Sequence, residues 1–583
     1  MDLSDSSTTS DPPEPPPAAP AGSATLAEPA PSAEAAQAAP GTTATPAAPA
    51  LPPSVRPRPV DAVFWGALSI IALFVLWASV SSTSLNDAMT SAMDATARSV
   101  GWLYLLVPLG CIALLIYLAL SRYGTIRLGP DASRPEYSTW AWLAMVLSAV
   151  MGIGLISYAV AEPISHFAAP PHGRAEAGTM DAAVTAMQFS YFDWGPHAWG
   201  VFGVFGLAIA YSTHRRNRPG LVSPMLRPIF GARVDGWLGK VIDIFAVIAT
   251  LFGTTTSLGL GAAQIAEGLD GVFGIPSSLV GQIVIIAVIT VLFTLSALSG
   301  VHRGIKYLSQ TTMLLSAGLG VYVLIVGPTN FLSNLFFRSV GQYLSEFFTV
   351  SLITPSTPED VQWMQWWTYF MMAWWLSWGA FVGVFLAKIS KGRTVREFVA
   401  GIVGVPSLVF FLWFTIFGGT AINIDMNGGG EIGAAALEDI NSAFFATLEH
   451  LPLVTITSII AIILVVLYFV SGADANTFVL SMLSSQGSLN PRRTVLLVWG
   501  LVTGLTAVVL LLVGGLAALQ QAAMLSALPF TLIVALLGIS LVIELRGDEE
   551  FNAVQNATRG SVQTAFDCDE QVPGASVGAV PLD

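Results

Sequence analysis

Twelve apolar stretches, each long enough to cross a bilayer, constrain the fold of this chain more than any other feature. At 1.5 Å per residue, a helix needs about 20 apolar residues to cross roughly 30 Å of hydrocarbon. Only 10% of the 583 residues are charged, against about a quarter in soluble domains. The sequence therefore predicts an all-α integral membrane protein with twelve transmembrane helices within residues 59–545. These spans begin near Phe64, Gly101, Trp140, Ala182, Val241, Ser278, Leu308, Trp363, Glu397, Pro452, Thr494 and Ala522.

The basic residues fall almost entirely in alternate loops. The loops after even-numbered spans contain 17 Lys and Arg residues, whereas the opposite loops contain Arg98, Arg174 and Arg338. Cytoplasmic loops carry such an excess of positive charge, so both termini are predicted to be cytoplasmic and the number of spans to be even. The expected location is the cell membrane.

Both ends of the chain have compositions typical of disordered segments. Residues 1–58 are rich in Pro and Ala, and they lack the positive and apolar regions of a signal peptide. Residues 546–583 are acidic and show no apolar periodicity. A short disordered cytoplasmic tail is therefore predicted at each end of the twelve-span domain.

The third span has two glycines at about the middle of the membrane, Gly152 and Gly154, on either side of Ile153. Each glycine lowers helix propensity by about 1 kcal/mol relative to alanine. Broken helices at this depth expose backbone groups to substrates and ions in many transporters. The segment is predicted to unwind, and a face of small residues for helix packing is the alternative.

Tryptophans cluster on two spans. The eighth span carries Trp374, Trp375 and Trp378, which lie too deep for the headgroup belt that tryptophan favours. The fourth span carries Trp194 and, one turn further, Trp199 with Phe202. Indole faces attract a desolvated quaternary ammonium by about 2 kcal/mol or more. The two clusters predict an aromatic box for such a cation, and packing between helices is the alternative.

Five groups of motifs lie along the chain's spans: MGIGL and a following EP within 151–163, WGPHAW at 194–199, FGTTTSLGLGAAQI at 252–265, AWWLSW and GRTVREF within 373–398, and IFGGTAI at 416–422. With these motifs the chain resembles the betaine/choline/carnitine transporter family, from residue 61 to residue 545. The resemblance implies a LeuT-like fold, with two inverted five-helix repeats (spans 3–7 and 8–12) after two additional N-terminal helices. It also implies a homotrimer whose contacts include the amphipathic segment 331–348.

The same resemblance implies a substrate and a binding site. Family members carry solutes with a quaternary ammonium group, and glycine betaine is the expected substrate, taken up with sodium. The box corresponds to Trp194, Trp199, Phe202 and Trp375, and the path leading to it to Trp374 and Trp378. The unwound segment that faces the substrate corresponds to Met151, Gly152, Ile153 and Gly154.

Sodium is the expected coupling ion. Thr250 and Thr254 present two hydroxyls on one helix face, a pattern that taken alone more often reflects bonding within the helix. By resemblance they match a sodium site, with Met151 and Phe381 nearby. A second family site would use the backbone around Ser148 and Met151 with Tyr468 and Ser471, although Gly472 stands where a hydroxyl is expected.

Three acids lie in or near the spans: Asp193, Asp243 and Asp474. A charged side chain within the membrane costs free energy, so these residues are candidates for a functional role. Asp243 and Asp474 are expected to be structural. Asp193 directly precedes the box residue Trp194, so it could accept a proton or meet a cationic substrate. The hypothesis is that Asp193 tunes coupling or charge preference, and a lining role in the outer vestibule is the alternative.

The sequence contains no metal-ligand cluster, phosphate loop or nucleophile elbow, so we expect neither an enzyme nor a cofactor other than sodium ions. The expected partners are the bilayer and a small onium osmolyte, with no nucleic acid. Two alternatives remain open. One is proton-coupled or exchange transport of choline, carnitine or ectoine, and the more remote one is a channel.

Overall fold

The computed structural model describes residues 60–150, 152–299 and 302–548, without the side chains of 148–150, 153 and 302–309. Met151, the predicted tail at 1–58 and the predicted tail from 549 onward therefore lie outside the described residues. Helices account for almost all of the described chain, which contains no strand and a single isolated bridge between Arg127 and Thr394.

The helices of the first part of the chain include four long apolar ones, α1, α3, α10 and α11. They are α1 (Ala62–Val80), α2 (Ser82–Ser99), α3 (Leu103–Leu120), α4 (Thr139–Val150), α5 (Ile153–Ala168), α6 (Met180–Trp194), α7 (Pro196–Ala210), α8 (Val222–Met225), α9 (Arg227–Phe230), α10 (Trp237–Phe273), α11 (Leu279–Ser299) and α12 (His302–Val326).

The second part contains the longest helix, α22. Its helices are α13 (Thr329–Ser345), α14 (Phe347–Ser351), α15 (Pro358–Trp366), α16 (Thr368–Ile389), α17 (Val395–Val399), α18 (Val405–Gly428), α19 (Glu431–Glu438), α20 (Ala443–Glu449), α21 (Val454–Leu483) and α22 (Arg493–Arg546). Short 3₁₀ or π segments are η2 (Arg122–Thr125), η3 (Pro171–Gly173), η4 (Tyr211–Arg215), η5 (Gly231–Asp235) and η6 (Ala400–Gly404).

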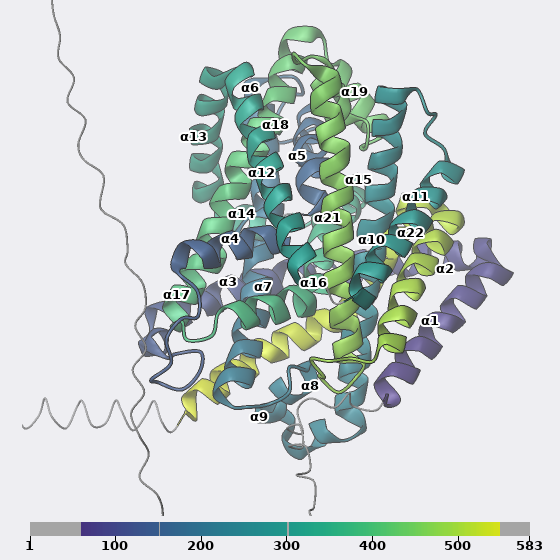
Figure 1. Cartoon of the computed structure of the whole chain (residues 1–583). Coiled ribbons are helices and arrows are strands. Elements are labelled where there is room, and N and C mark those ends of the chain that lie inside the picture. The colour runs from purple at the N-terminus through teal and green to yellow at the C-terminus, as the bar shows by residue number, and fades with distance from the viewer. Residues whose placement is uncertain (1–59, 151, 300–301, 549–583) are drawn as a thin grey trace, which may run out of the picture. The chain divides into compact units, whose positions relative to one another are not determined.

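The long helices pack side by side, and segments from opposite ends of the described chain meet: α1 and α2 contact α22 (Figure 1). Within the described residues, eight helical segments are long and apolar enough to cross a membrane, or nine if the bent pair Gln310–Val326 and Thr329–Ser345 counts as one span. Large apolar side chains such as Leu73 and Leu120 point outward from these helices. The chain is an integral membrane protein.

The eight or nine candidate spans of the described chain are fewer than the twelve predicted, and several of the predicted spans coincide with interrupted helices. Helices α4, α5, α6 and α7 have only 12, 16, 15 and 15 residues, because the chain breaks at Gly152 and again at Gly195. Helix α22 has 54 residues, about 80 Å of helix, but its backbone is non-helical at Gly514 and Gly515. Interrupted helices are therefore too short to cross a membrane alone, and the kinked α22 is one continuous helical segment.

The helices around the broken segment pack closely through glycines. A Cβ at Gly379 or Gly383 of α16 would lie 2.2 or 2.6 Å from an atom of Phe205 on α7. Small residues at such contacts let two helix backbones approach within a membrane, where no hydrophobic force drives them together. Helices α7 and α16 are thereby held together, and each of them carries part of the predicted aromatic box.

The C-terminal end of α22 is bound to the segment that follows α7. Asp548 is buried, and it accepts hydrogen bonds from the hydroxyl of Tyr211 at 2.6 Å and from Nε of Arg215 at 2.5 Å. Glu544 pairs with Arg218 at 2.6 Å. Residues 546–548, which were expected to begin a disordered tail, are thus part of the packed structure.

We expect Asp548→Asn to destabilise the protein, because it leaves the buried guanidinium of Arg215 without its nearest carboxylate. Loss of one partner from a buried pair costs about 3 to 5 kcal/mol. The control is Asp131→Asn, which removes a 39% exposed carboxylate from the same Arg215, a loss of about 1 kcal/mol or less. Thermal unfolding in detergent should show a clear decrease in Tm for Asp548→Asn alone, and equal decreases would contradict the structural role of Asp548.

Candidate functional site

The third predicted span is broken where its glycines lie. Helix α4 ends at Val150 and α5 begins at Ile153, with Gly152 in an extended conformation (φ −117°, ψ −158°) between them. A Cβ at Gly154 would lie only 2.2 Å from Cη2 of Trp194. The indole of Trp194 therefore packs directly on the backbone of α5, an arrangement that requires glycine at residue 154.

One pocket collects side chains from six helices, α5, α6, α7, α10, α16 and α18, that lie far apart in the sequence. Most of its lining was predicted from the sequence, and Ala198, Ser257 and Phe410 were not. The side chain of Ile153 and the whole of Met151 lie outside the described part of the chain. The predicted residues that line the pocket are Gly152, Gly154, Trp194, Trp199, Phe202, Trp374, Trp375 and Trp378.

The aromatic rings of the pocket meet edge to face or stack. The ring centroids of Trp194 and Trp375 are 4.8 Å apart at 71°, and those of Phe202 and Trp375 are 6.0 Å apart at 81°. Trp374 stacks on Trp375 at 5.1 Å, and Trp199 meets Phe202 edge-on at 5.8 Å. Such pairs are in van der Waals contact, so the rings form a continuous aromatic lining.

Hydrogen bonds fix three of the indoles. Nε1 of Trp194 donates to Oε2 of Glu162 at 2.6 Å, and Nε1 of Trp375 donates to the backbone oxygen of Asp193 at 2.7 Å. Nε1 of Trp374 donates to the backbone oxygen of Gly253 at 3.2 Å. Buried indole N–H groups normally find such partners. Because their N–H groups are bound to helix residues, these rings can present π faces to a ligand.

Trp378 differs from its neighbours. Its Nε1 is buried and has no hydrogen-bond partner among the described residues. An unsatisfied buried donor costs about 1 to 3 kcal/mol. Since the ring lines the pocket, this N–H is available to an acceptor atom on a bound ligand.

The first predicted ion set is on α10 and α16, which pack against each other. The hydroxyl of Thr254 donates to the backbone oxygen of Thr250 at 2.8 Å, which is bonding within the helix. The hydroxyl of Thr250 is buried without a partner in the described structure. Phe381 is buried, and its ring contacts Trp378. One oxygen of this set is therefore free to bind an ion.

The second predicted ion set is engaged elsewhere in this structure. The hydroxyl of Tyr468 pairs with that of Ser316 on α12 at 2.8 Å, and Ser471 donates to the backbone oxygen of Tyr468 at 3.1 Å. The side chain of Ser148 and all of Met151 lie outside the described residues.

The three intramembrane acids have different surroundings. Asp243 accepts hydrogen bonds from the amide and the hydroxyl of Ser223, and Asp474 accepts one from the hydroxyl of Ser296. Both bonding patterns fit a structural role. Asp193 has neither carboxylate oxygen bonded to another described residue.

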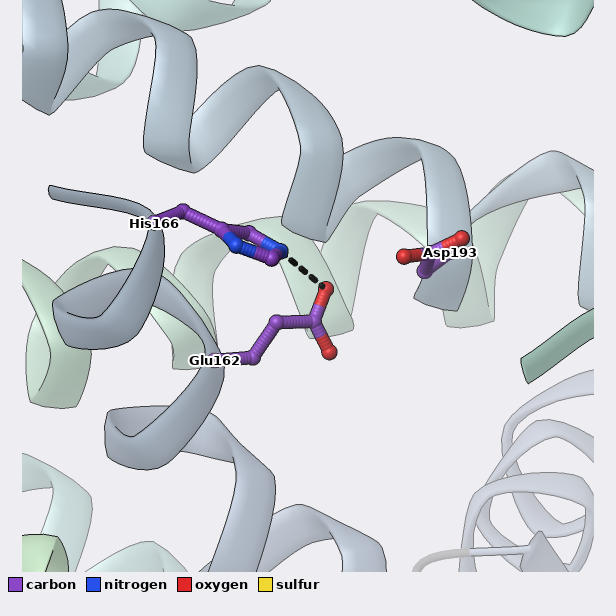
Figure 2. Close-up of side chains that lie close together, drawn as sticks. All are labelled: Glu162, His166 and Asp193. Carbon is purple, nitrogen blue, oxygen red and sulfur yellow. Dashed lines mark ion pairs between the residues drawn. The ribbon is translucent and has the colours of Figure 1, made fainter. Parts of the chain in front are cut away.

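Asp193 lies close to Glu162 and His166 of α5, as Figure 2 shows. One carboxylate oxygen of Glu162, one ring nitrogen of His166 and one carboxylate oxygen of Asp193 all lie within 4.8 Å of one another. All three side chains are fully buried. Sequence reasoning singled out Asp193 and recorded Glu162 only as part of a motif. The sequence did contain a signal for this cluster. Glu162 and His166 lie four residues apart on one helix face, and Asp193 directly precedes the box residue Trp194.

Comparison with known proteins identifies relatives over the same range. The model of the BCCT family, betaine/carnitine/choline family transporters, matches residues 62–550. The glycine betaine transporter OpuD of Bacillus subtilis is 45% identical over 83% of this chain and 94% of its own length. A probable glycine betaine transporter of Desulfitobacterium hafniense is 41% identical over 84% and 98%. An ectoine/hydroxyectoine transporter of Virgibacillus pantothenticus is 40% identical over 84% and 97%.

We expect Gly154→Ala to weaken binding of tetramethylammonium at least about tenfold, because the added methyl group would displace the indole of Trp194. Quenching of tryptophan fluorescence in the purified protein measures the affinity. Gly318→Ala on α12 is the control, since a Cβ there meets no atom within 4 Å. Unchanged affinity in Gly154→Ala would show that the position of Trp194 does not matter for binding.

Proposed function

The chain belongs to the betaine/carnitine/choline transporter family, and we propose that it imports glycine betaine together with sodium ions by alternating access. The single observation that supports this most is the pocket in which Trp194, Trp199, Phe202 and Trp375 come together beside the break at Gly152. Aromatic faces bind an onium group, and a helix break exposes backbone groups to the rest of the substrate. The named relatives carry betaine or ectoine.

The two ends of a betaine molecule would find different partners. The trimethylammonium group would lie against the aromatic faces of the box. The carboxylate would accept a hydrogen bond from Nε1 of Trp378, which has no other partner in the described structure. It would also lie near Gly152, at the N-terminus of the 16-residue helix α5, where backbone N–H groups and the helix dipole favour an anion.

Sodium coupling rests on the unpartnered oxygen of Thr250. A small alkali cation binds hard oxygen donors, and the proposal assigns Thr250, Thr254 and Phe381 to such a site by resemblance to the family. Proton coupling or exchange, with choline, carnitine or ectoine as substrate, is the second candidate. It is favoured by Asp193 behind the box, whose two carboxylate oxygens have no hydrogen-bond partner among the described residues. A channel is the more remote alternative.

The proposed transport cycle implies a particular topology. Twelve spans result if α22 is divided at its kink, α12 is counted, and the pairs α4–α5 and α6–α7 each cross once. Spans 3–7 and 8–12 would then be the inverted repeats of a LeuT-like fold, and both termini would be cytoplasmic in the cell membrane. A homotrimer would form through the surface of α13, on which Phe337 and Leu344 are exposed.

Uptake of labelled glycine betaine, choline, carnitine and ectoine into proteoliposomes, each with and without a sodium gradient, tests the proposal. Saturable betaine uptake that accumulates only with an inward sodium gradient is expected. Accumulation driven by a pH gradient alone would support the second candidate, and flux that does not saturate would indicate a channel.

Trp375→Leu should raise the KM for glycine betaine about 30-fold, because a desolvated cation–π contact contributes about 2 kcal/mol. The matched control is Trp65→Leu on α1, where the tryptophan is 61% exposed and does not line the pocket. Equal KM values for the two variants in proteoliposome uptake would exclude the box as the substrate site.

Thr250→Ala should raise the sodium concentration for half-maximal uptake about tenfold, since a bond to a charged group contributes about 1.5 to 3 kcal/mol. Thr255→Ala serves as the control, because the hydroxyl of Thr255 only bonds the backbone oxygen of Phe252 within the same helix. If the sodium dependence of both variants matches that of the wild type, Thr250 is not an ion ligand.

A further inference from the structure

We propose that Glu162, His166 and Asp193 form a proton-binding site behind the aromatic box, and that a proton there competes with a cation in the box. The inference rests on the proposed function, since it concerns the same pocket. Five polar atoms of the three side chains are buried without a hydrogen-bond partner in the described structure: Oε1 of Glu162, Nδ1 and Nε2 of His166, and both carboxylate oxygens of Asp193.

Two buried carboxylates with no Lys or Arg partner cannot both stay ionised in this setting without a large penalty. No Lys or Arg of the described chain forms an ion pair with Glu162 or Asp193. Each uncompensated buried charge costs several kcal/mol. Binding of one proton by the cluster would halve its negative charge, and the imidazole of His166, with Nε2 3.9 Å from Oε1 of Glu162, is the third group that can hold it.

The cluster is directly connected to the box. Glu162 accepts the N–H of Trp194, and the backbone oxygen of Asp193 accepts the N–H of Trp375. Two of the rings against which an onium group would lie are therefore hydrogen-bonded to residues of the cluster, one to the carboxylate of Glu162 and one to the backbone of Asp193. Negative charge behind these rings attracts a cation in front of them through a medium of low dielectric. The deprotonated cluster binds a cation more tightly, and by reciprocity a bound cation promotes loss of the proton.

The geometry fits a proton better than a metal ion. Two ligand atoms on a tetrahedral zinc ion are roughly 3.4 Å apart, closer than the 3.9 Å between Glu162 and His166. Sodium prefers oxygen ligands, which makes an imidazole a poor partner. Oε2 of Glu162 is already occupied by the indole of Trp194.

Other titratable groups lie near the cluster, and their contribution to any pH dependence must be distinguished from that of the cluster. Tyr158 on α5 contacts the ring of Trp194, and Tyr343 on α13 contacts that of Tyr191; an ordinary tyrosine, with a pKa of about 10, is protonated through the pH range of the test. His172 of η3 and His166 both contact the ring of Trp363, and His172 pairs with Asp360 at 2.8 Å. His197 of α7 bonds the hydroxyl of Ser351 at 2.9 Å. His172 is therefore the group that most needs a control variant.

The test measures binding to the purified full chain by titration calorimetry between pH 5.5 and 8.5, in buffers that contain a chelator. Choline carries a net positive charge, whereas glycine betaine is net neutral. As the pH rises through the range in which the cluster loses its proton, the Kd for choline should fall up to tenfold per pH unit. The Kd for glycine betaine should change less. Titration in two buffers of different ionisation enthalpy should show release of up to one proton per choline bound.

Variants locate the effect. Glu162→Gln and Asp193→Asn should each reduce the pH dependence of the choline Kd to less than about twofold per pH unit. His172→Gln and Asp243→Asn should retain the full dependence, because neither residue belongs to the cluster. If a cluster variant fails to fold, proton release by the wild type still decides the question.

The possible results separate the two proposals. Choline binding with a pH-independent Kd and no proton release would overturn the proton site and leave the proposed transport function intact. Retained pH dependence in both Glu162→Gln and Asp193→Asn would also overturn it. Absence of onium binding at every pH would instead contradict the proposed function.

Discussion

The contact between the indole of Trp194 and the backbone of Gly154 is the interaction on which the candidate site depends. A methyl group at residue 154 would lie 2.2 Å from the ring, so the contact exists only because residue 154 is glycine. The same glycine, with Gly152, weakens the helix and permits the break between α4 and α5. One sequence feature thus opens the backbone towards the pocket and positions the first ring of the aromatic lining.

Hydrogen bonds from the indole N–H groups also position the rings, because a membrane interior offers few acceptors. An indole N–H in hydrocarbon must find an acceptor, and those of Trp194, Trp374 and Trp375 find Glu162, Gly253 and the backbone of Asp193. These acceptors belong to α5, α10 and α6, so the bonds join helices as well as orient rings. The box is therefore a property of the helix arrangement, and displacement of any of these helices would change the aromatic lining.

The sequence predicted the helical class and most of the pocket lining, because tryptophans deep in a span and paired glycines are rare enough to carry information. It did not predict Phe410, since one phenylalanine in a continuous apolar run has no distinguishing signal. The twelve predicted spans do not appear as twelve long helices in the described structure, because the breaks at Gly152 and Gly195 shorten the helices. Glu162 was missed because its meaning arises from Asp193 on another helix.

The contact between Trp194 and Trp375 has a consequence for access to the site. With centroids 4.8 Å apart, these two rings leave no room between them for a trimethylammonium group, which itself needs several ångströms from each ring face. A cation can bind against the outer faces of the pair, or between them once α6 and α16 separate. Because Trp194 donates to the carboxylate of Glu162 and Trp375 donates to the backbone oxygen of Asp193, such a separation would also disturb these two hydrogen bonds. Under the proposed proton site, ligand entry would thereby be coupled to the charge state of the cluster.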